Sequence, residues 1–205
     1  MSTPEIIARI LLKEKAVFLR PEDPFTWTSG IKSPVYCDNR LLFSTVESRE
    51  IIVDAFVESI KLLNVHVIAG TATAGIPWAS FIAMKMKLPL IYVRSSSKEH
   101  GRQNAIEGQA AAGSTTVLVE DLISTGKSSI AAAQRLEEAG LKLEKVMSIF
   151  TYGFPQAEAA FNEAHIAFSS LSNFDILAQT AFENKQFDEK TLGQVLAWRK
   201  SVKFP

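Results

Sequence analysis

The chain has 205 residues, enough to bury one sizeable core, and we expect a single α/β domain over residues 1–205. Hydrophobic residues make up 47% and charged residues 21%, which excludes a disordered or fibrous protein. The 22 basic and 22 acidic side chains cancel, so nothing in the net charge suggests binding to nucleic acid or to a membrane. The only cysteine, Cys37, excludes an intrachain disulfide, and the histidines lack metal-ligand spacing.

The first part of the chain predicts a helix followed by a turn-rich segment. Apolar residues at helical spacing place a helix over residues 4–14, with Thr3 as its cap. A strand over residues 16–20 leads into residues 21–40, which are interrupted by Pro24, Gly30 and Pro34. On pattern alone, the aromatic residues of this segment predict a β-hairpin that covers the edge of the core. The opening residues lack the features of a secretory leader, and we expect a cytoplasmic protein without membrane spans.

The rest of the chain alternates helices and strands, which predicts a mainly parallel sheet with helices on both faces. We expect helices over residues 47–63, 76–86, 128–139, 156–164, 174–182 and 188–200. We expect strands over residues 65–69, 89–93, 116–119, 145–151 and 165–169. The domain then divides into an N-terminal helix and hood, an α/β core and C-terminal helices, at about residues 1–45, 46–170 and 171–205.

The stretch over residues 116–129, TVLVEDLISTGKSS, carries the most chemical information. Its first four residues form an apolar, mostly β-branched run, typical of a strand buried on both faces. The run stops at Glu120 and Asp121, where open α/β sheets place their ligands, and carboxylates there can accept hydrogen bonds from hydroxyl groups. Small, hydroxyl-rich residues and Gly126 follow before a helix, so backbone N–H groups can converge there on a phosphate.

Two other interpretations of this stretch compete with a phosphate site. A strand could end in solvated acids and be followed by an ordinary helix with a Ser or Thr cap. The residues Gly126-Lys127-Ser128 also look like the end of a P-loop. The spacing rejects a P-loop, because its first glycine would have to stand where the chain has Asp121.

Two further stretches follow predicted strands. Residues 70–77, GTATAGIP, offer small side chains and free N–H groups suited to pyrophosphate, although a tight turn without a ligand has the same composition. Residues 94–108, RSSSKEHGRQNAIEG, have no apolar period and carry the basic residues Arg94, Lys98, His100 and Arg102. Such a run is either a solvated loop or a lid, and its start at a strand end beside the acidic strand favours a lid.

The strand, acidic pair and hydroxyl-rich turn resemble the phosphoribosyl pyrophosphate (PRPP) motif of type I phosphoribosyltransferases. The sequence TSGIKSPVYCDNR resembles the Ser-Gly-x-x-Ser-Pro hood signature of orotate phosphoribosyltransferases, and residues 94–108 resemble their mobile catalytic loop. The resemblance implies a type I phosphoribosyltransferase fold with a small N-terminal hood. It also implies transfer of phosphoribose from PRPP to orotate, in pyrimidine biosynthesis, by a homodimer that shares the 94–108 loop across its interface. Two alternatives are a transferase for another base and a PRPP-sensing regulator, whose basic face or added DNA-binding domain is not evident here.

The same resemblance assigns the site residues. It implies catalytic roles for Arg94, Lys98, His100 and Asp121. PRPP would be bound by these residues together with Thr71, Ala72, Glu120, Leu122, Ile123, Ser124, Thr125, Gly126, Lys127 and Ser128. Orotate would be bound by Ser124, Lys32 and Tyr36. We expect Mg²⁺ as the cofactor, held by PRPP oxygens and water, because the sequence has no carboxylate or histidine cage for it.

Some positions depart from the pattern of other members. Thr28 and Ala74 replace lysines, and Tyr152 and Gly153 stand where some members carry an arginine that reaches the orotate carboxylate. The ligand of that carboxylate therefore stays open among Lys32, Ser124 and backbone groups of the hood.

Overall fold

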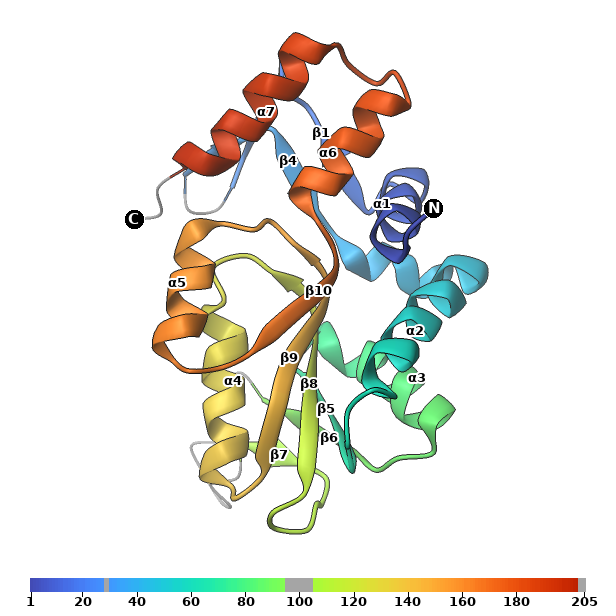
Figure 1. The fold of residues 1–205 in the computed structure, drawn as a ribbon, viewed down its shortest axis with the longest axis vertical. Coiled ribbons are helices and arrows are strands. Elements are labelled where there is room, and N and C mark those ends of the chain that lie inside the picture. Colours follow the sequence, from blue (N-terminus) through green and yellow to red (C-terminus); the bar gives the residue numbers. More distant parts are fainter. Residues whose placement is uncertain (28–29, 95–104, 203–205) are drawn as a thin grey trace.

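The computed structural model describes residues 1–27, 30–94 and 105–202 (Figure 1). Its centre is a six-stranded sheet with the strand order β10-β9-β8-β5-β6-β7. Five strands pair in parallel: β5 (Val67–Thr71), β6 (Leu90–Val93), β8 (Thr115–Ile123), β9 (Lys142–Thr151) and β10 (Phe168–Asn173). The sixth, β7 (Ile106–Glu107), pairs antiparallel with β6 at one edge. The mainly parallel sheet predicted from the alternating pattern is confirmed.

Helices cover both faces of the sheet (Figure 1). One face carries α2 (Val46–Ile60) and α3 (Gly75–Met86), and the other carries α4 (Lys127–Glu138) and α5 (Pro155–Glu163). Consecutive residues of β8 are buried in the two different cores: Val117 and Val119 in the first, Leu118 in the second. Because side chains alternate along a strand, a strand covered on both faces must be apolar at every position, as this run is.

The hood is built from two short antiparallel pairs. Strand β1 (Val17–Leu19) pairs with β4 (Val35–Cys37), and β2 (Phe25–Thr26) pairs with β3 (Lys32–Ser33). A 3-10 helix, η1 (Asn39–Ser44), leads from β4 into α2. The hairpin predicted for this segment is confirmed, and its Trp27 ring lies 5.3 Å from the Tyr152 ring at the end of β9.

The C-terminal helices α6 (Phe174–Glu183) and α7 (Glu189–Ser201) lie at the same end of the molecule as the hood (Figure 1). The Trp198 ring of α7 packs edge-on against Trp27 at 6.1 Å, and its Nε1–H donates to the Lys32 carbonyl at 3.0 Å. The hood therefore contacts both Tyr152, the residue that follows β9, and helix α7. No helix within the described residues is long and apolar enough to cross a membrane.

Several predicted boundaries are wrong. Helix α1 (Thr3–Lys13) is capped by Ser2, whose N–H donates to the Glu5 carboxylate at 2.8 Å, and Thr3 is its first residue. Strand β10 begins three residues later than the predicted start at residue 165 and runs to Asn173. Two other differences concern the site: β8 continues beyond Val119 to Ile123, and the loop predicted over residues 94–108 contains β7. Tertiary pairing explains both, because Ile123 pairs with Thr151 of β9 and Ile106 pairs with Val93 of β6.

Candidate active site

Two strand-to-helix turns meet at the carboxyl edge of the sheet. Residues 120–126, here called the acidic turn, join the apolar part of β8 to α4. Residues 71–75, called the small-residue turn, join β5 to α3. Strands β5 and β8 are parallel neighbours, with Gly70 in register with Val119. The two turns therefore lie side by side, as the predicted ligand site requires.

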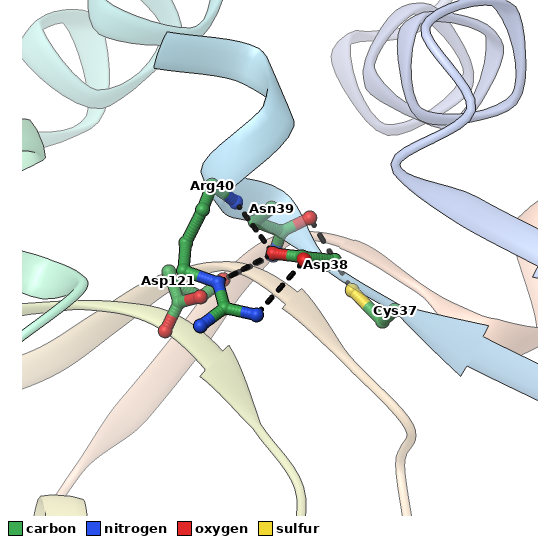
Figure 2. A network of polar contacts seen from close by, with 5 residues as sticks. All are labelled: Cys37, Asp38, Asn39, Arg40 and Asp121. Carbon is green, nitrogen blue, oxygen red and sulfur yellow. Dashed lines mark hydrogen bonds and ion pairs between the residues drawn. The ribbon is translucent and has the colours of Figure 1, made fainter.

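The two acids of the acidic turn lie in the last part of the strand and not beyond it. Glu120 is 6% exposed, and its carboxylate accepts from the Ser129 hydroxyl at 3.3 Å and from the Asp121 N–H at 3.1 Å. Asp121 is half-buried and lies beneath the hood, near Arg40 (Figure 2). The alternative interpretation, in which the strand ends in solvated acids, is wrong for Glu120, because β9 extends the ladder past this position.

Burial makes the two carboxyls unequal. Burial, and then the neighbouring Asp121 charge, raise the pKa of Glu120 well above its usual 4.5. Burial also raises the pKa of Asp121, but a hydrogen bond from Glu120 and the Arg40 charge act in the opposite direction. Asp121 is therefore the member of the pair that ionises more readily, since like charges in one site separate in pKa.

The end of the acidic turn forms the first turn of α4. Gly126 has a φ of +81°, and a Cβ added there would lie 2.7 Å from Cε2 of Phe161, so only glycine fits. Ser124 and Thr125 are half-buried, whereas Lys127 and Ser128 are exposed at the helix N-terminus, where the dipole favours an anion. Leu122 and Ile123 have core side chains, so that only their backbone groups could meet a ligand.

The small-residue turn is defined by close backbone packing. A Cβ on Gly75 would lie 2.3 Å from the Val119 carbonyl oxygen, so this glycine lets α3 start directly against β8. Thr71 is 5% exposed, and its hydroxyl has no hydrogen-bond partner among the described residues. Ala72 donates its N–H to the Val93 carbonyl at 2.8 Å, and the Ala72–Thr73 peptide bond is cis. A buried polar atom without a protein partner indicates a place for a ligand or water.

The cationic residues are only partly described. Arg94 follows β6, its N–H donates to the Ala105 carbonyl at 2.8 Å, and its guanidinium lies 3.4 Å from the Glu107 carboxylate. Lys98 and His100, together with Arg102, lie outside the described residues, and their predicted roles stay predictions. Arg94 directly follows β6, which is the strand next to β5 in the sheet.

The predicted orotate residues of the hood are exposed. Lys32 is exposed on β3, and Tyr36 is 41% exposed on β4, with its ring 5.6 Å from Phe25. Tyr152 is buried under the hood, and burial raises the pKa of its phenol well above 10, so it stays neutral. The structure thus brings Thr71, Ala72, Glu120, Asp121 and the start of α4 to one sheet edge, and adds the hood as a cover.

Comparison with known proteins supplies the family. A model of the phosphoribosyl transferase domain matches residues 44–173. The orotate phosphoribosyltransferase of Staphylococcus epidermidis is 48% identical over 198 residues, which cover 96% of this chain and 98% of that protein. The chain belongs to the orotate phosphoribosyltransferase family. The enzyme of that name from Coxiella burnetii is 47% identical over 95% of this chain and 94% of its own length.

The fold of this chain is similar to that of a solved orotate phosphoribosyltransferase. The crystal structure of the protein from Aeropyrum pernix has a TM-score of 0.75 and 26% identity, covering 89% of this chain and 99% of that one. The type I phosphoribosyltransferase fold is therefore confirmed.

Two polar residues at the site of this family member were not predicted. Asn39, fully buried at the start of η1, donates from Nδ2 to the Asp121 carbonyl at 2.7 Å (Figure 2). Arg40 next to it binds both carboxylate oxygens of Asp38, at 2.6 and 2.8 Å. Both residues stand in the hood signature, which was the available signal, but its pattern does not reveal a partner 82 residues away.

The two carboxylates of the acidic turn could bind Mg²⁺ only together with oxygen atoms of a bound ligand. Among the residues that the structure describes, no group of three or more His, Cys, Asp or Glu side chains could hold a metal ion. Glu120 and Asp121 supply hard oxygen donors, and Mg²⁺ commonly uses one or two carboxylates together with substrate phosphates and water. The donor set therefore suits a Mg²⁺ ion that PRPP brings with it.

Proposed function

We propose that the chain is an orotate phosphoribosyltransferase, which transfers phosphoribose from PRPP to orotate. The bond from C1′ to the pyrophosphate oxygen breaks, and pyrophosphate leaves with the electron pair. The bond from C1′ to N1 of orotate forms, and N1 gives up its proton to water. The products are orotidine 5′-monophosphate and pyrophosphate, as required for pyrimidine biosynthesis. The observation that carries this proposal is the 48% identity to an orotate phosphoribosyltransferase across nearly the whole of both chains.

In the proposal, the charge of each residue determines which part of PRPP it contacts. Positive charge develops on the ribose ring and negative charge on the leaving pyrophosphate, so positioning and electrostatics can supply the catalysis without a covalent nucleophile. In the proposal, Glu120 and Asp121 accept the ribose hydroxyls. The 5′-phosphate lies at the start of α4, held by Ser124, Thr125, Gly126, Lys127 and Ser128.

Pyrophosphate faces the small-residue turn, where Thr71 and Ala72 lie. Arg94, Lys98 and His100 stabilise it as it leaves, with Lys98 or His100 as the proton donor. Bound Mg²⁺ supplies further neutralisation of the pyrophosphate charge. Lys32, Tyr36 and Ser124 would bind orotate, beneath the hood. The exposure of Lys32 and Tyr36 supports this role, because neither side chain is committed to the core.

The decisive assay measures the loss of orotate absorbance with PRPP and Mg²⁺, beside the same assay with hypoxanthine, adenine and uracil. Turnover confined to orotate is expected. Turnover of another base instead would replace orotate as the substrate. PRPP binding without turnover of any base would favour a PRPP-sensing regulator.

The proposal includes a homodimer in which residues 94–108 of one subunit close over the site of the other. An activated ribose is hydrolysed unless water is excluded, and a polar loop with cations can close on a bound anion. A cytoplasmic location belongs to the same proposal, and the single cysteine accords with a reducing compartment.

Complementation tests the shared loop. Lys98→Ala and Asp121→Asn should each be nearly inactive alone. If the loop acts across the interface, a mixed dimer has one site with both defects and one site with neither. Random reassortment makes about half of the dimers mixed, so activity should return to roughly a quarter of the wild-type value. If subunits exchange and activity does not recover, each loop serves its own subunit.

A further inference from the structure

Asn39 connects the hood directly to the acidic strand. It follows β4 and is fully buried, and its Nδ2 donates to the Asp121 carbonyl at 2.7 Å while its Oδ1 accepts from the Cys37 thiol at 3.3 Å (Figure 2). A buried amide with both ends engaged holds two parts of the chain at a fixed separation. The parts are the end of the hood and the main chain of the acidic turn.

The Asp121 carbonyl lies where strand pairing on one side of β8 has already ended. Pairing of β8 with β5 ends at Val119. On the other side, Glu120 is in register with Ser148 and Leu122 with Phe150, so β9 continues alongside Asp121. A carbonyl oxygen has two lone pairs, so the Asn39 amide can bind the Asp121 main chain beside this ladder and fix its position.

The direction of both hydrogen bonds is determined by chemistry. A carbonyl oxygen only accepts, so the Asn39 atom that faces Asp121 must be the nitrogen, and its oxygen then faces Cys37. Burial raises the pKa of the Cys37 thiol, which therefore stays protonated and donates. The Arg40 guanidinium, bound at 2.6 and 2.8 Å to Asp38, stabilises the turn on the other side of Asn39. The start of η1 is thereby held in one conformation.

We propose that Asn39 is a positioning residue for the ribose of PRPP, which fixes the Asp121 main chain and couples the hood to the acidic turn. This inference rests on the proposed function in taking PRPP as the ligand of Asp121. The carboxylate of Asp121 projects from the main chain that Asn39 holds, so a shift of that chain moves the carboxylate away from the ribose hydroxyls. PRPP binding and the conformation of residues 35–44 are then linked.

Two Asn39 variants and two controls test the inference by calorimetric titration of PRPP with Mg²⁺, without orotate. Asn39→Ala and Asn39→Asp should weaken PRPP binding about tenfold, the effect of losing the hydrogen bond that fixes the Asp121 main chain. Cys37→Ser keeps a donor to Oδ1 and should bind PRPP like wild type. Ser172→Ala is the matched control, since the Ser172 hydroxyl, 1% exposed, donates to the distant Pro4 carbonyl at 2.9 Å. It should lower the melting temperature and leave PRPP affinity unchanged.

The inference is wrong if both Asn39 variants bind PRPP as tightly as Ser172→Ala does. Hydrogen exchange on the wild type covers the case in which the Asn39 variants do not fold. PRPP with Mg²⁺ should slow amide exchange in residues 35–44, and unchanged exchange there overturns the coupling. A wild type that binds PRPP but does not convert orotate would refute the proposed function alone, because neither measurement uses orotate.

Discussion

The acidic turn and the small-residue turn lie side by side at one sheet edge but are built in opposite ways. The acidic turn is held by side chains that come from elsewhere: Ser129 binds Glu120, and Asn39 binds the Asp121 carbonyl. The small-residue turn is defined by the absence of side chains, because Gly75 lets α3 start against the Val119 carbonyl. Substitution of the acids should therefore affect ligand binding in the first turn, whereas substitution of Gly75 should affect folding in the second.

The largest effect is expected for Gly75→Ala, since the new Cβ would lie 2.3 Å from the Val119 carbonyl oxygen. That atom belongs to the backbone of the central strand β8, so it can move only if the strand is distorted. We expect a loss of about 3 kcal/mol or more in the free energy of unfolding, measured by thermal and urea denaturation. Gly193→Ala in α7 is the control: nothing lies within 4 Å of its Cβ, and a gain of roughly 0.5–1 kcal/mol is expected. Equal destabilisation by both would contradict the comparison.

Asp121→Asn should have the largest effect on catalysis with little effect on folding. The Asn39 bond goes to the main chain and survives the substitution, whereas a charge-assisted bond to the ribose is lost. A loss of roughly 1.5–3 kcal/mol corresponds to about tenfold to a hundredfold in kcat/KM for PRPP. Asp175→Asn changes an exposed acid that binds Arg199, and it should leave kcat/KM unaltered. Wild-type kinetics from Asp121→Asn would remove this residue from the site.

Glu120→Gln should weaken PRPP use about tenfold and change how stability depends on pH. The folded-state pKa of Glu120 lies above the ordinary value of 4.5. Its contribution to stability is therefore fully present below that value and is lost as pH rises through the raised pKa. Glutamine does not ionise, so thermal melts between pH 4.5 and neutrality should show a smaller decline for the variant. Parallel declines would mean that the Glu120 pKa is not raised.

The sequence predicted the layers of this molecule better than the details of its site. The run over residues 116–119 indicated a strand buried on both faces, and its residues do alternate between the two cores. The same run placed both acids beyond the strand end. This was wrong because an acid can continue a strand when its neighbour supplies a partner, as Ser148 does for Glu120. Composition does not contain that information.

The hood contains a contact that neither its turn pattern nor its resemblance to a family could predict. Its turn residues predicted a hairpin, and its signature implied a cover over the base. Neither could predict the role of Asn39, because its partner is 82 residues away in the sequence. The roles of Lys98 and His100 stay predictions, since these residues lie outside the described part of the chain.

The smallest effect is expected for Thr71→Val in the small-residue turn, and it tests the buried hydroxyl there that has no partner among the described residues. The Thr71 hydroxyl is buried and has no partner among the described residues, so valine of the same shape should fold at least as well. If the hydroxyl binds pyrophosphate, PRPP affinity should fall about threefold to tenfold, the range for one hydrogen bond of roughly 0.5–1.5 kcal/mol. Thr116→Val is the matched control, because its buried hydroxyl donates to the Val67 carbonyl at 3.0 Å. That variant should melt at a lower temperature and bind PRPP normally. If Thr71→Val instead destabilises the fold and leaves PRPP affinity unchanged, the small-residue turn contributes to PRPP binding through its backbone alone.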